Sequence, residues 1–208
     1  TFTEQAKILS QNFSINQREK DLSGFPPFSL LANSLGATSI LAPINPSRPA
    51  SVNAKRLYKT LKDYEVSFAS GSPAIWYKLL DYCLKEKKTL PNLKSLLMFG
   101  APVQARVHTL FKKIMPNAQT FTPYGATECL PVSSISGDEI VTRTYKKTKK
   151  GAGTCIGRAL CKTKIKIISE EENTLIEKKP YEEGEIIVSA QQMSKSYFLN
   201  KQANKDTK

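Results

Sequence analysis

The sequence has no apolar run approaching the ~20 residues that a membrane-spanning helix requires, so we expect no membrane span. Its one histidine, His108, cannot complete a zinc site with the four cysteines, because no two cysteines form a C-x-x-C pair. Free thiols in a reducing compartment, and therefore a cytoplasmic location, are expected. Hydrophobic residues make up 40% of the chain, which favours a folded globule over disorder.

Acidic residues are scarce: 18 Asp and Glu stand against 31 Lys and Arg, giving a net charge of +13. The excess is spread along the chain, since residues 1–137 hold 16 basic and 8 acidic groups (+8) and residues 138–208 hold 15 and 10 (+5). Residues 146–150 form a true lysine cluster. A solvated lysine-rich surface explains this charge, and no nucleic-acid partner is expected; a basic nucleic-acid-binding module stays as the alternative.

Up to residue 137 the pattern alternates between helix and strand. Helices are predicted at residues 3–13, 28–35, from an N-cap at Ser51, from Ser72-Pro73, and at 107–114; strands are predicted at 38–41, 66–69 and 93–99. Strands that alternate with helices of this length indicate βαβ units. The predicted fold class is therefore α/β, a layered and mostly parallel sheet with flanking helices.

After Gly137 the sequence pattern changes, and it predicts short strands separated by glycine or acidic turns. These are predicted at residues 139–145, 162–168, 174–176 and 184–188. We therefore expect two parts, an α/β subdomain over residues 1–137 and a β-rich, partial antiparallel barrel-like subdomain over residues 138–208.

The most informative stretch runs from Phe121 to Glu128, FTPYGATE. A strand feeding its turn would bring Tyr124, Thr127 and Glu128 to the carboxyl edge of a sheet, where open α/β folds bind ligands. The tyrosine ring can cover a nucleobase, the threonine can donate to a phosphate, and the carboxylate can hold Mg²⁺. The alternative for Glu128 is a carboxylate at the start of a helix.

About one βα unit earlier, Met98-Phe99-Gly100-Ala101-Pro102 ends a predicted strand in a small, proline-stopped turn. Such a turn leaves room for a flat ring to approach the backbone. Taken alone, G-A-P is an ordinary strand-to-helix turn.

Together, the Y-G-x-T-E and G-A-P motifs resemble those of the acyl-adenylate-forming superfamily of acyl-CoA synthetases, peptide-synthetase adenylation domains and luciferase. The resemblance implies ATP/AMP binding with Mg²⁺. It implies catalytic roles for Thr127 and Glu128, the latter as metal ligand. The implied nucleotide-binding residues are Gly100, Ala101, Pro102, Tyr124, Gly125, Ala126 and Thr127.

The segment from Phe25 to Leu31 resembles the family's aromatic motif beside the acyl pocket, with Ser29 where many acyl-CoA synthetases carry histidine. This pattern is similar to the fatty-acid–CoA-ligase-like branch that includes the olefin-pathway β-lactone synthetases. The implied substrate-binding residues are Phe28, Gly71, Ser72, Trp76 and Gly100. The alternative for Trp76 is a core side chain on a helix face.

Two further segments resemble structural motifs of the same family. Gly151 to Arg158 is similar to a glycine-rich turn under the nucleotide site, and it lacks the Gly-Lys-Ser/Thr ending of a phosphate-cradling loop. Residues 184–188 with 197–200 resemble a strand and the aromatic turn after it. Both are expected to be structural.

The resemblance covers the middle of the family's length. It implies N- and C-terminal parts outside this sequence, a phosphate loop upstream and a T-G-D aspartate and adenylate-contacting lysine downstream. We expect a fragment, inactive alone, of an enzyme that joins a fatty or β-hydroxy acid to AMP and passes it to coenzyme A or an internal hydroxyl. A non-catalytic nucleotide-binding remnant is the alternative.

Overall fold

The computed structural model describes residues 2–171 and 174–207. The helices are α1 (Phe2–Phe13), α2 (Pro26–Ser34), α3 (Ala54–Asp63), α4 (Pro73–Lys85), α5 (Ala105–Ile114), α6 (Gly137–Glu139), α7 (Tyr145–Lys149) and α8 (Lys201–Thr207), with a 3₁₀ turn η1 (Pro49–Ser51) and a π-helical turn η2 (Ile140–Thr144). The strands are β1 (Lys20–Ser23), β2 (Thr38–Ser39), β3 (Phe68–Gly71), β4 (Ser95–Met98), β5 (Gln119–Ala126), β6 (Cys129–Ser136), β7 (Arg158–Ala159), β8 (Lys164–Glu171), β9 (Thr174–Glu177) and β10 (Glu185–Ser189). In this described part, no helix has the length and apolar character needed to cross a membrane.

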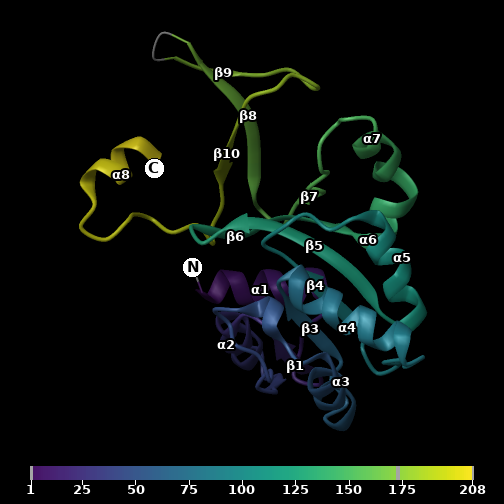
Figure 1. Ribbon diagram of the computed structural model, residues 1–208. Coiled ribbons are helices and arrows are strands. Elements are labelled where there is room, and N and C mark those ends of the chain that lie inside the picture. The colour runs from purple at the N-terminus through teal and green to yellow at the C-terminus, as the bar shows by residue number, and fades with distance from the viewer. Residues whose placement is uncertain (1, 172–173, 208) are drawn as a thin grey trace.

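A seven-stranded sheet in the order β2-β1-β3-β4-β5-β6-β7 organises the chain (Figure 1). The pairs from β2 through β5 are parallel, and β6 and β7 add antiparallel pairs at one edge. This confirms the predicted α/β class with a mostly parallel sheet.

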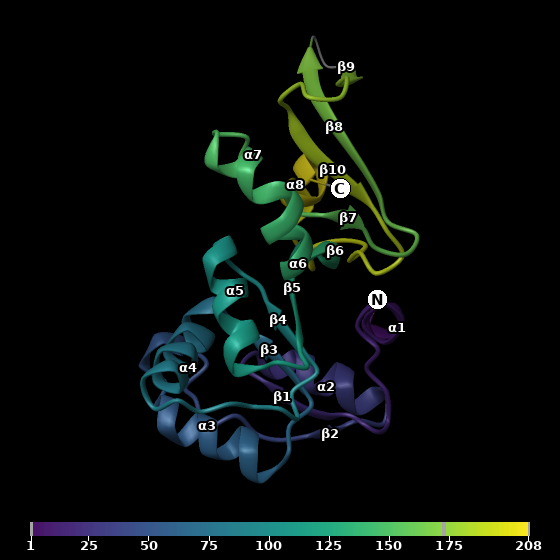
Figure 2. The ribbon, with the colours of Figure 1, turned by 90° about the vertical axis from the view of Figure 1, so that its right-hand side faces the viewer.

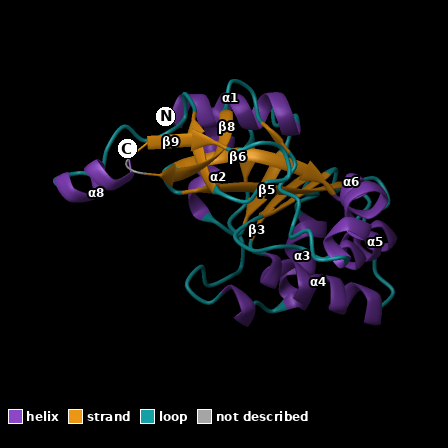
Figure 3. Cartoon of the chain, turned by 90° about the horizontal axis from the view of Figure 1, so that it is seen from above, coloured by secondary structure: helices purple, strands orange, loops and turns teal. Residues whose placement is uncertain are grey.

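Helices cover both faces of this sheet (Figure 3). The side chains of β4 alternate between the two faces. Leu96 and Met98 pack into the core under α3, α4 and α5, whereas Leu97 between them packs with α1 and α2. Successive strand side chains point to opposite faces, so a strand buried on both sides must be apolar throughout. The continuous run of apolar residues in β4 follows from this burial.

Two helix starts illustrate the local signals. Ser72 caps α4 as predicted, with its hydroxyl accepting a hydrogen bond from the Ala74 amide, and Pro73 occupies the first helical position. The predicted cap at Ser51 is wrong. Asn53 caps α3 by accepting from the Arg56 amide at 2.9 Å, and Ser51 lies in η1, where it donates to the Arg48 carbonyl.

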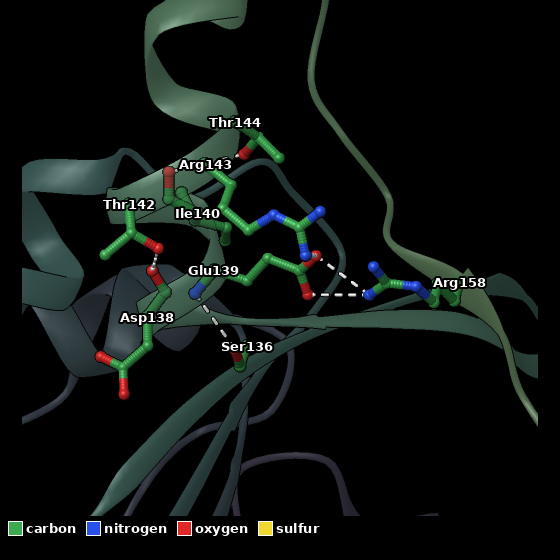
Figure 4. A network of polar contacts seen from close by, with 8 residues as sticks. All are labelled: Ser136, Asp138, Glu139, Ile140, Thr142, Arg143, Thr144 and Arg158. Carbon is green, nitrogen blue, oxygen red and sulfur yellow. Dashed lines mark hydrogen bonds and ion pairs between the residues drawn. The ribbon is translucent and has the colours of Figure 1, made fainter.

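The predicted strand at residues 139–145 is also wrong, because this segment is helical from α6 through η2 to α7 (Figure 4). Ser136 accepts a hydrogen bond from the Glu139 amide, as in a Ser-x-x-Glu helix start. Glu139 pairs with Arg143 one turn later, and it binds Arg158 of β7 through both carboxylate oxygens at 2.9 and 3.0 Å. These local contacts favour a helix in the segment for which a strand was predicted.

A separate three-stranded antiparallel sheet in the order β10-β8-β9 follows (Figure 2). Its strands β8, β9 and β10 confirm the strands predicted at residues 162–168, 174–176 and 184–188. The short strand β7, which lies between β6 and β8 in the sequence, pairs with β6 and so belongs to the first sheet. The division of the chain at residues 137/138 stays a prediction.

Asp21 on β1 is an acidic residue in the core, with 1% of its surface exposed. Its Oδ2 accepts from the Ser29 and Ser39 hydroxyls at 3.2 and 3.4 Å, while within the described residues Oδ1 has no partner. Burial raises the pKa of Asp21 to about 6, although the two hydroxyls oppose the shift. Ionising Asp21 in the folded protein therefore costs stability.

We expect Asp21→Asn to stabilise the protein at pH 8 and to change its stability far less at pH 4. Because the pKa is raised on folding, the contribution of Asp21 is fully present below 3.8 and is lost as pH rises through about 6. The difference between these two pKa values corresponds to at most ~3 kcal/mol in the free energy of unfolding. Urea unfolding at both pH values measures it, with Asp63→Asn, an exposed carboxylate, as the control. A gain that is equal at both pH values would contradict this reading.

Candidate functional site

Parallel strands end around one cavity of about 1260 Å³. Gly24 and Ser72 follow β1 and β3 directly, Gly100 lies two residues beyond β4, and Ala126 is the last residue of β5; all four line the cavity. The carboxyl edge of a parallel sheet is where open α/β folds bind ligands. The structure thus brings together the turns that the sequence singled out.

The turn after β4 forms one wall, where Gly100, Ala101 and Pro102 all line the cavity. Gly100 has a φ of +89°, which disfavours any side chain, and a Cβ built there would have no atom within 4 Å. The wall is therefore backbone next to open space, which suits the close approach of a flat ring. Helix α5 begins at Ala105, three residues after Pro102 and two residues before the predicted start at residue 107.

The residues of the YGATE motif line the cavity at the tip of a hairpin between β5 and β6. The pairing register shifts between Tyr124 and Ala126, so Gly125 lies at a β-bulge. A Cβ on Gly125 would lie 2.7 Å from the Cys129 carbonyl oxygen, so the bulge itself requires glycine. A strand, and not a helix, follows Glu128, which removes the helix-start alternative for that carboxylate.

Within the tip, Tyr124 and Thr127 are exposed to the cavity and Glu128 is half-buried. The Glu128 carbonyl accepts from the Ser194 amide at 2.7 Å, and its carboxylate Oε1 accepts from the Tyr197 hydroxyl at 2.8 Å. The Glu128 carboxylate raises the pKa of Tyr197, chiefly through this hydrogen bond.

The metal-ligating groups near Glu128 determine which cation could bind there. The described residues contain no cluster of three or more His, Cys, Asp or Glu side chains able to hold a metal alone. Mg²⁺ is commonly held by one or two carboxylates with substrate phosphates and water completing the shell. A single carboxylate beside the hydroxyl of Thr127 fits a magnesium–nucleotide and does not fit a metal bound by protein alone.

Aromatic rings form another wall of the cavity. Phe28 stacks on Phe99 with ring centroids 4.7 Å apart, and Phe25 lies 6.0 and 6.1 Å from these two rings. All three line the cavity together with Leu31. This wall is apolar and suits a hydrocarbon group. Phe28 therefore lines the cavity together with Phe99, and its substrate-binding role stays a prediction.

Gly71 and Trp76 do not line the cavity. Trp76 is fully buried in the core between the sheet and α3–α5, because its face of α4 points at the sheet. A Cβ on Gly71 would lie 3.1 Å from the Gly24 Cα, so its small size lets the β1–α2 corner pack closely. The structure thus corrects both substrate-binding assignments, whereas Ser72 does reach the cavity.

Among the cavity residues that sequence reasoning missed, two groups lie after Gly137. Tyr145, Thr148 and Lys149 come from α7, which had been predicted in part as a strand. Gln192 and Ser194 come from the segment after β10. The Ser136-x-x-Glu139 helix start was a readable signal for the first group, whereas nothing local in the sequence marks the second.

Comparison with known proteins shows the family to which the sequence is related. A family model described as AMP-binding enzyme matches residues 26–198. Two relatives named olefin beta-lactone synthetase are similar: the one from Xanthomonas campestris pv. campestris is 34% identical over 100% of this chain, and that from Stenotrophomonas maltophilia is 35% identical over 97%. The chain spans 38% and 37% of the length of these two proteins.

Solved structures share the fold. The O-succinylbenzoate coenzyme A synthetase of Bacillus subtilis, in complex with ATP and magnesium ion, superposes with a TM-score of 0.75 at 21% identity. The match covers 99% of this chain and 40% of that protein. At this level of identity the likeness establishes the arrangement of helices and strands.

Proposed function

The chain belongs to the AMP-binding enzyme family, and on that premise we propose that it forms the nucleotide- and acid-binding centre of a ligase. The reaction is the ATP-dependent activation of a carboxylic acid as its acyl-adenylate, with release of pyrophosphate. The whole protein then transfers the acyl group from AMP, which is released, to coenzyme A, or to an internal hydroxyl, in which case a β-lactone closes. The single observation that carries the proposal is the convergence of the GAP and YGATE turns on one cavity.

In this proposal the nucleotide lies between the two turns. The backbone around Gly100 faces one side of the base and the Tyr124 ring covers another, where its hydroxyl stays in solvent. The Thr127 hydroxyl would donate to an α-phosphate oxygen, and the Glu128 carboxylate would hold the magnesium ion together with the phosphates. When bound, that ion supplies neutralisation of the charge on the phosphates.

The chain needs no general base for this step. A carboxylic acid is already ionised at neutral pH, so its oxygen is ready to attack the α-phosphorus. What the residues must supply is alignment of the two reactants and stabilisation of the developing charge. Thr127 and Glu128 at the hairpin tip contribute to both.

We propose that the acid is a fatty or β-hydroxy fatty acid and not an amino acid. Of the described residues that line the cavity, Glu128 alone carries a carboxylate. In this proposal that carboxylate is occupied by the magnesium ion of the nucleotide. A substrate ammonium would then be buried without a counter-ion, which is prohibitive. The rings of Phe25, Phe28 and Phe99 offer an alkyl chain an apolar wall instead.

We expect ATP–pyrophosphate exchange by the intact protein to rise with the length of a straight-chain acid. Each buried methylene contributes ~0.8 kcal/mol, or about a fourfold gain in affinity, until the apolar wall ends. The measurement is exchange at fixed acid concentration from six to sixteen carbons, with the twenty amino acids as the comparison set. Stronger exchange with any amino acid than with every fatty acid would overturn the substrate class.

A further inference from the structure

The segment after β10 folds back onto the β5–β6 hairpin, and hydrogen bonds join the two. Gln192 Nε2 donates to the Pro131 carbonyl at 2.9 Å, the Ser194 amide to the Glu128 carbonyl at 2.7 Å, and the Tyr197 hydroxyl to Glu128 Oε1 at 2.8 Å. In Figure 1 this yellow segment passes the end of β6 on its way to α8. We call residues 192–197 the strap.

Gln192 anchors the strap in the protein interior. Its side chain is 3% exposed, and besides the Pro131 carbonyl it donates to the Thr163 hydroxyl at 3.0 Å. A buried amide with both contacts fixed is costly to displace. The strap therefore begins from a fixed point two residues before Ser194.

The other end of the strap is fixed by α8. Asn204 accepts a hydrogen bond from the Tyr197 amide at 2.6 Å and donates to the Tyr197 carbonyl at 3.0 Å. One side chain thus holds both backbone polar groups of Tyr197, while the Asn204 amide itself bonds the Asn200 carbonyl at 3.1 Å. The direction in which the tyrosine ring leaves the strap is set by these contacts.

The strap holds Glu128 at two places, its backbone carbonyl and its carboxylate. A phenol that donates to a carboxylate makes a short, charge-assisted hydrogen bond, stronger than one between neutral groups. A carboxylate oxygen can only accept, so the Tyr197 hydroxyl is the donor in this 2.8 Å hydrogen bond. The free rotation of a glutamate side chain at a hairpin tip is thereby restricted.

We propose that Tyr197 is a positioning residue, which fixes the Glu128 carboxylate in the orientation that shares the cation of a bound magnesium–nucleotide. This inference rests on the proposed function and goes beyond it, because it assigns a role to a residue 69 positions away that sequence reasoning had treated as structural. Partners that orient a metal-binding carboxylate typically change metal affinity by ~10–100-fold when removed.

The test uses the intact protein with Tyr197→Phe, which keeps the ring and removes the hydroxyl. Mn²⁺ takes the same oxygen ligands and is followed by electron paramagnetic resonance in the presence of a non-hydrolysable ATP analogue. We expect the apparent Kd for Mn²⁺ to rise about tenfold. Affinity for AMP without a cation should change less than about twofold, since the AMP contacts proposed here do not use Tyr197.

Two further variants sharpen the result. Tyr181→Phe is the matched control, because Tyr181 is 100% exposed and its hydroxyl loss should leave Mn²⁺ binding unchanged. Asn204→Ala removes the two hydrogen bonds from the Asn204 side chain to the backbone of Tyr197 and should raise the Kd in the same direction by a smaller factor. If Tyr197→Phe does not fold, Asn204→Ala alone decides the matter.

The outcomes separate this inference from the proposed function. Unchanged Mn²⁺ affinity in folded Tyr197→Phe, whatever its melting temperature, would mean that the strap is structural, and would overturn the positioning role alone. A wild-type protein that binds neither Mn²⁺–nucleotide nor AMP would overturn both. A raised Kd in Tyr197→Phe with wild-type affinity in Tyr181→Phe supports the assignment.

Discussion

Glu128→Gln is expected to lower ATP–pyrophosphate exchange by the intact protein about 10²–10³-fold, the range found when one charge-stabilising group is removed from an active site. The amide keeps an oxygen that can accept the Tyr197 hydroxyl but loses the negative charge that a magnesium ion requires. The fold should survive, because Glu128 is half-buried at a hairpin tip and its backbone bond to Ser194 is unaffected.

The measurement compares exchange rates at saturating acid and a range of Mg²⁺ concentrations, with the unfolding midpoint recorded alongside. Glu185→Gln, an exposed carboxylate on β10, is the control for loss of a negative charge elsewhere. Near-wild-type exchange by a folded Glu128→Gln variant would remove the metal-ligand role. Additional Mg²⁺ should restore part of the lost rate if the defect lies in metal binding.

The parallel part of the fold could be predicted from sequence because its signals are local. The apolar run at β4, the proline-led start of α4 and the stripe on α5 each fix an element without knowledge of its neighbours. Once these elements are ordered, the carboxyl ends of the strands must meet, so the convergence of Gly100 and Tyr124 on one cavity follows from topology. The roles assigned to individual cavity residues stay predictions.

The misses have physical causes. The segment at 139–145 carries Ile140, Val141 and Thr142, which favour a strand, yet the side-chain cap at Ser136 and the pairs made by Glu139 favour a helix. Trp76 lies at an apolar position of a helix, and local pattern cannot distinguish a core face from a ligand-facing one.

The contacts of the strap could not be predicted for a different reason. Its hydrogen bonds join Tyr197 to Glu128 and Gln192 to Pro131, 69 and 61 positions apart. Such contacts depend on how the second sheet returns the chain to the hairpin, and no local pattern encodes that path. The aromatic turn at 197–200 was recognised from sequence, but its partner could be identified only in three dimensions.

Gly157→Ala is expected to destabilise the protein by roughly 2–6 kcal/mol, combining the cost of a left-handed backbone with that of an overpacked contact. Gly157 has a φ of +81°, and a Cβ there would lie 1.9 Å from the Ser134 carbonyl oxygen, a backbone atom that cannot rotate away. Ser134 pairs with Arg158 across β6 and β7, so relieving the clash must break that pairing. The loss would be a large share of an ordinary domain's stability.

Gly153→Ala is the matched control for this substitution, because Gly153 lies in the same glycine-rich turn with a φ of +72° and has no atom within 4 Å of a Cβ. It carries the conformational strain without the clash and should cost only about 1–2 kcal/mol. Urea unfolding of both variants measures the difference, which isolates the contact with Ser134. Because Cys155 and Ile156 of this turn line the cavity, we also expect Gly157→Ala to weaken nucleotide binding at temperatures where it remains folded. Equal destabilisation by the two variants would show that the turn tolerates a side chain at Gly157 and that its glycine is not required for packing β7 against β6.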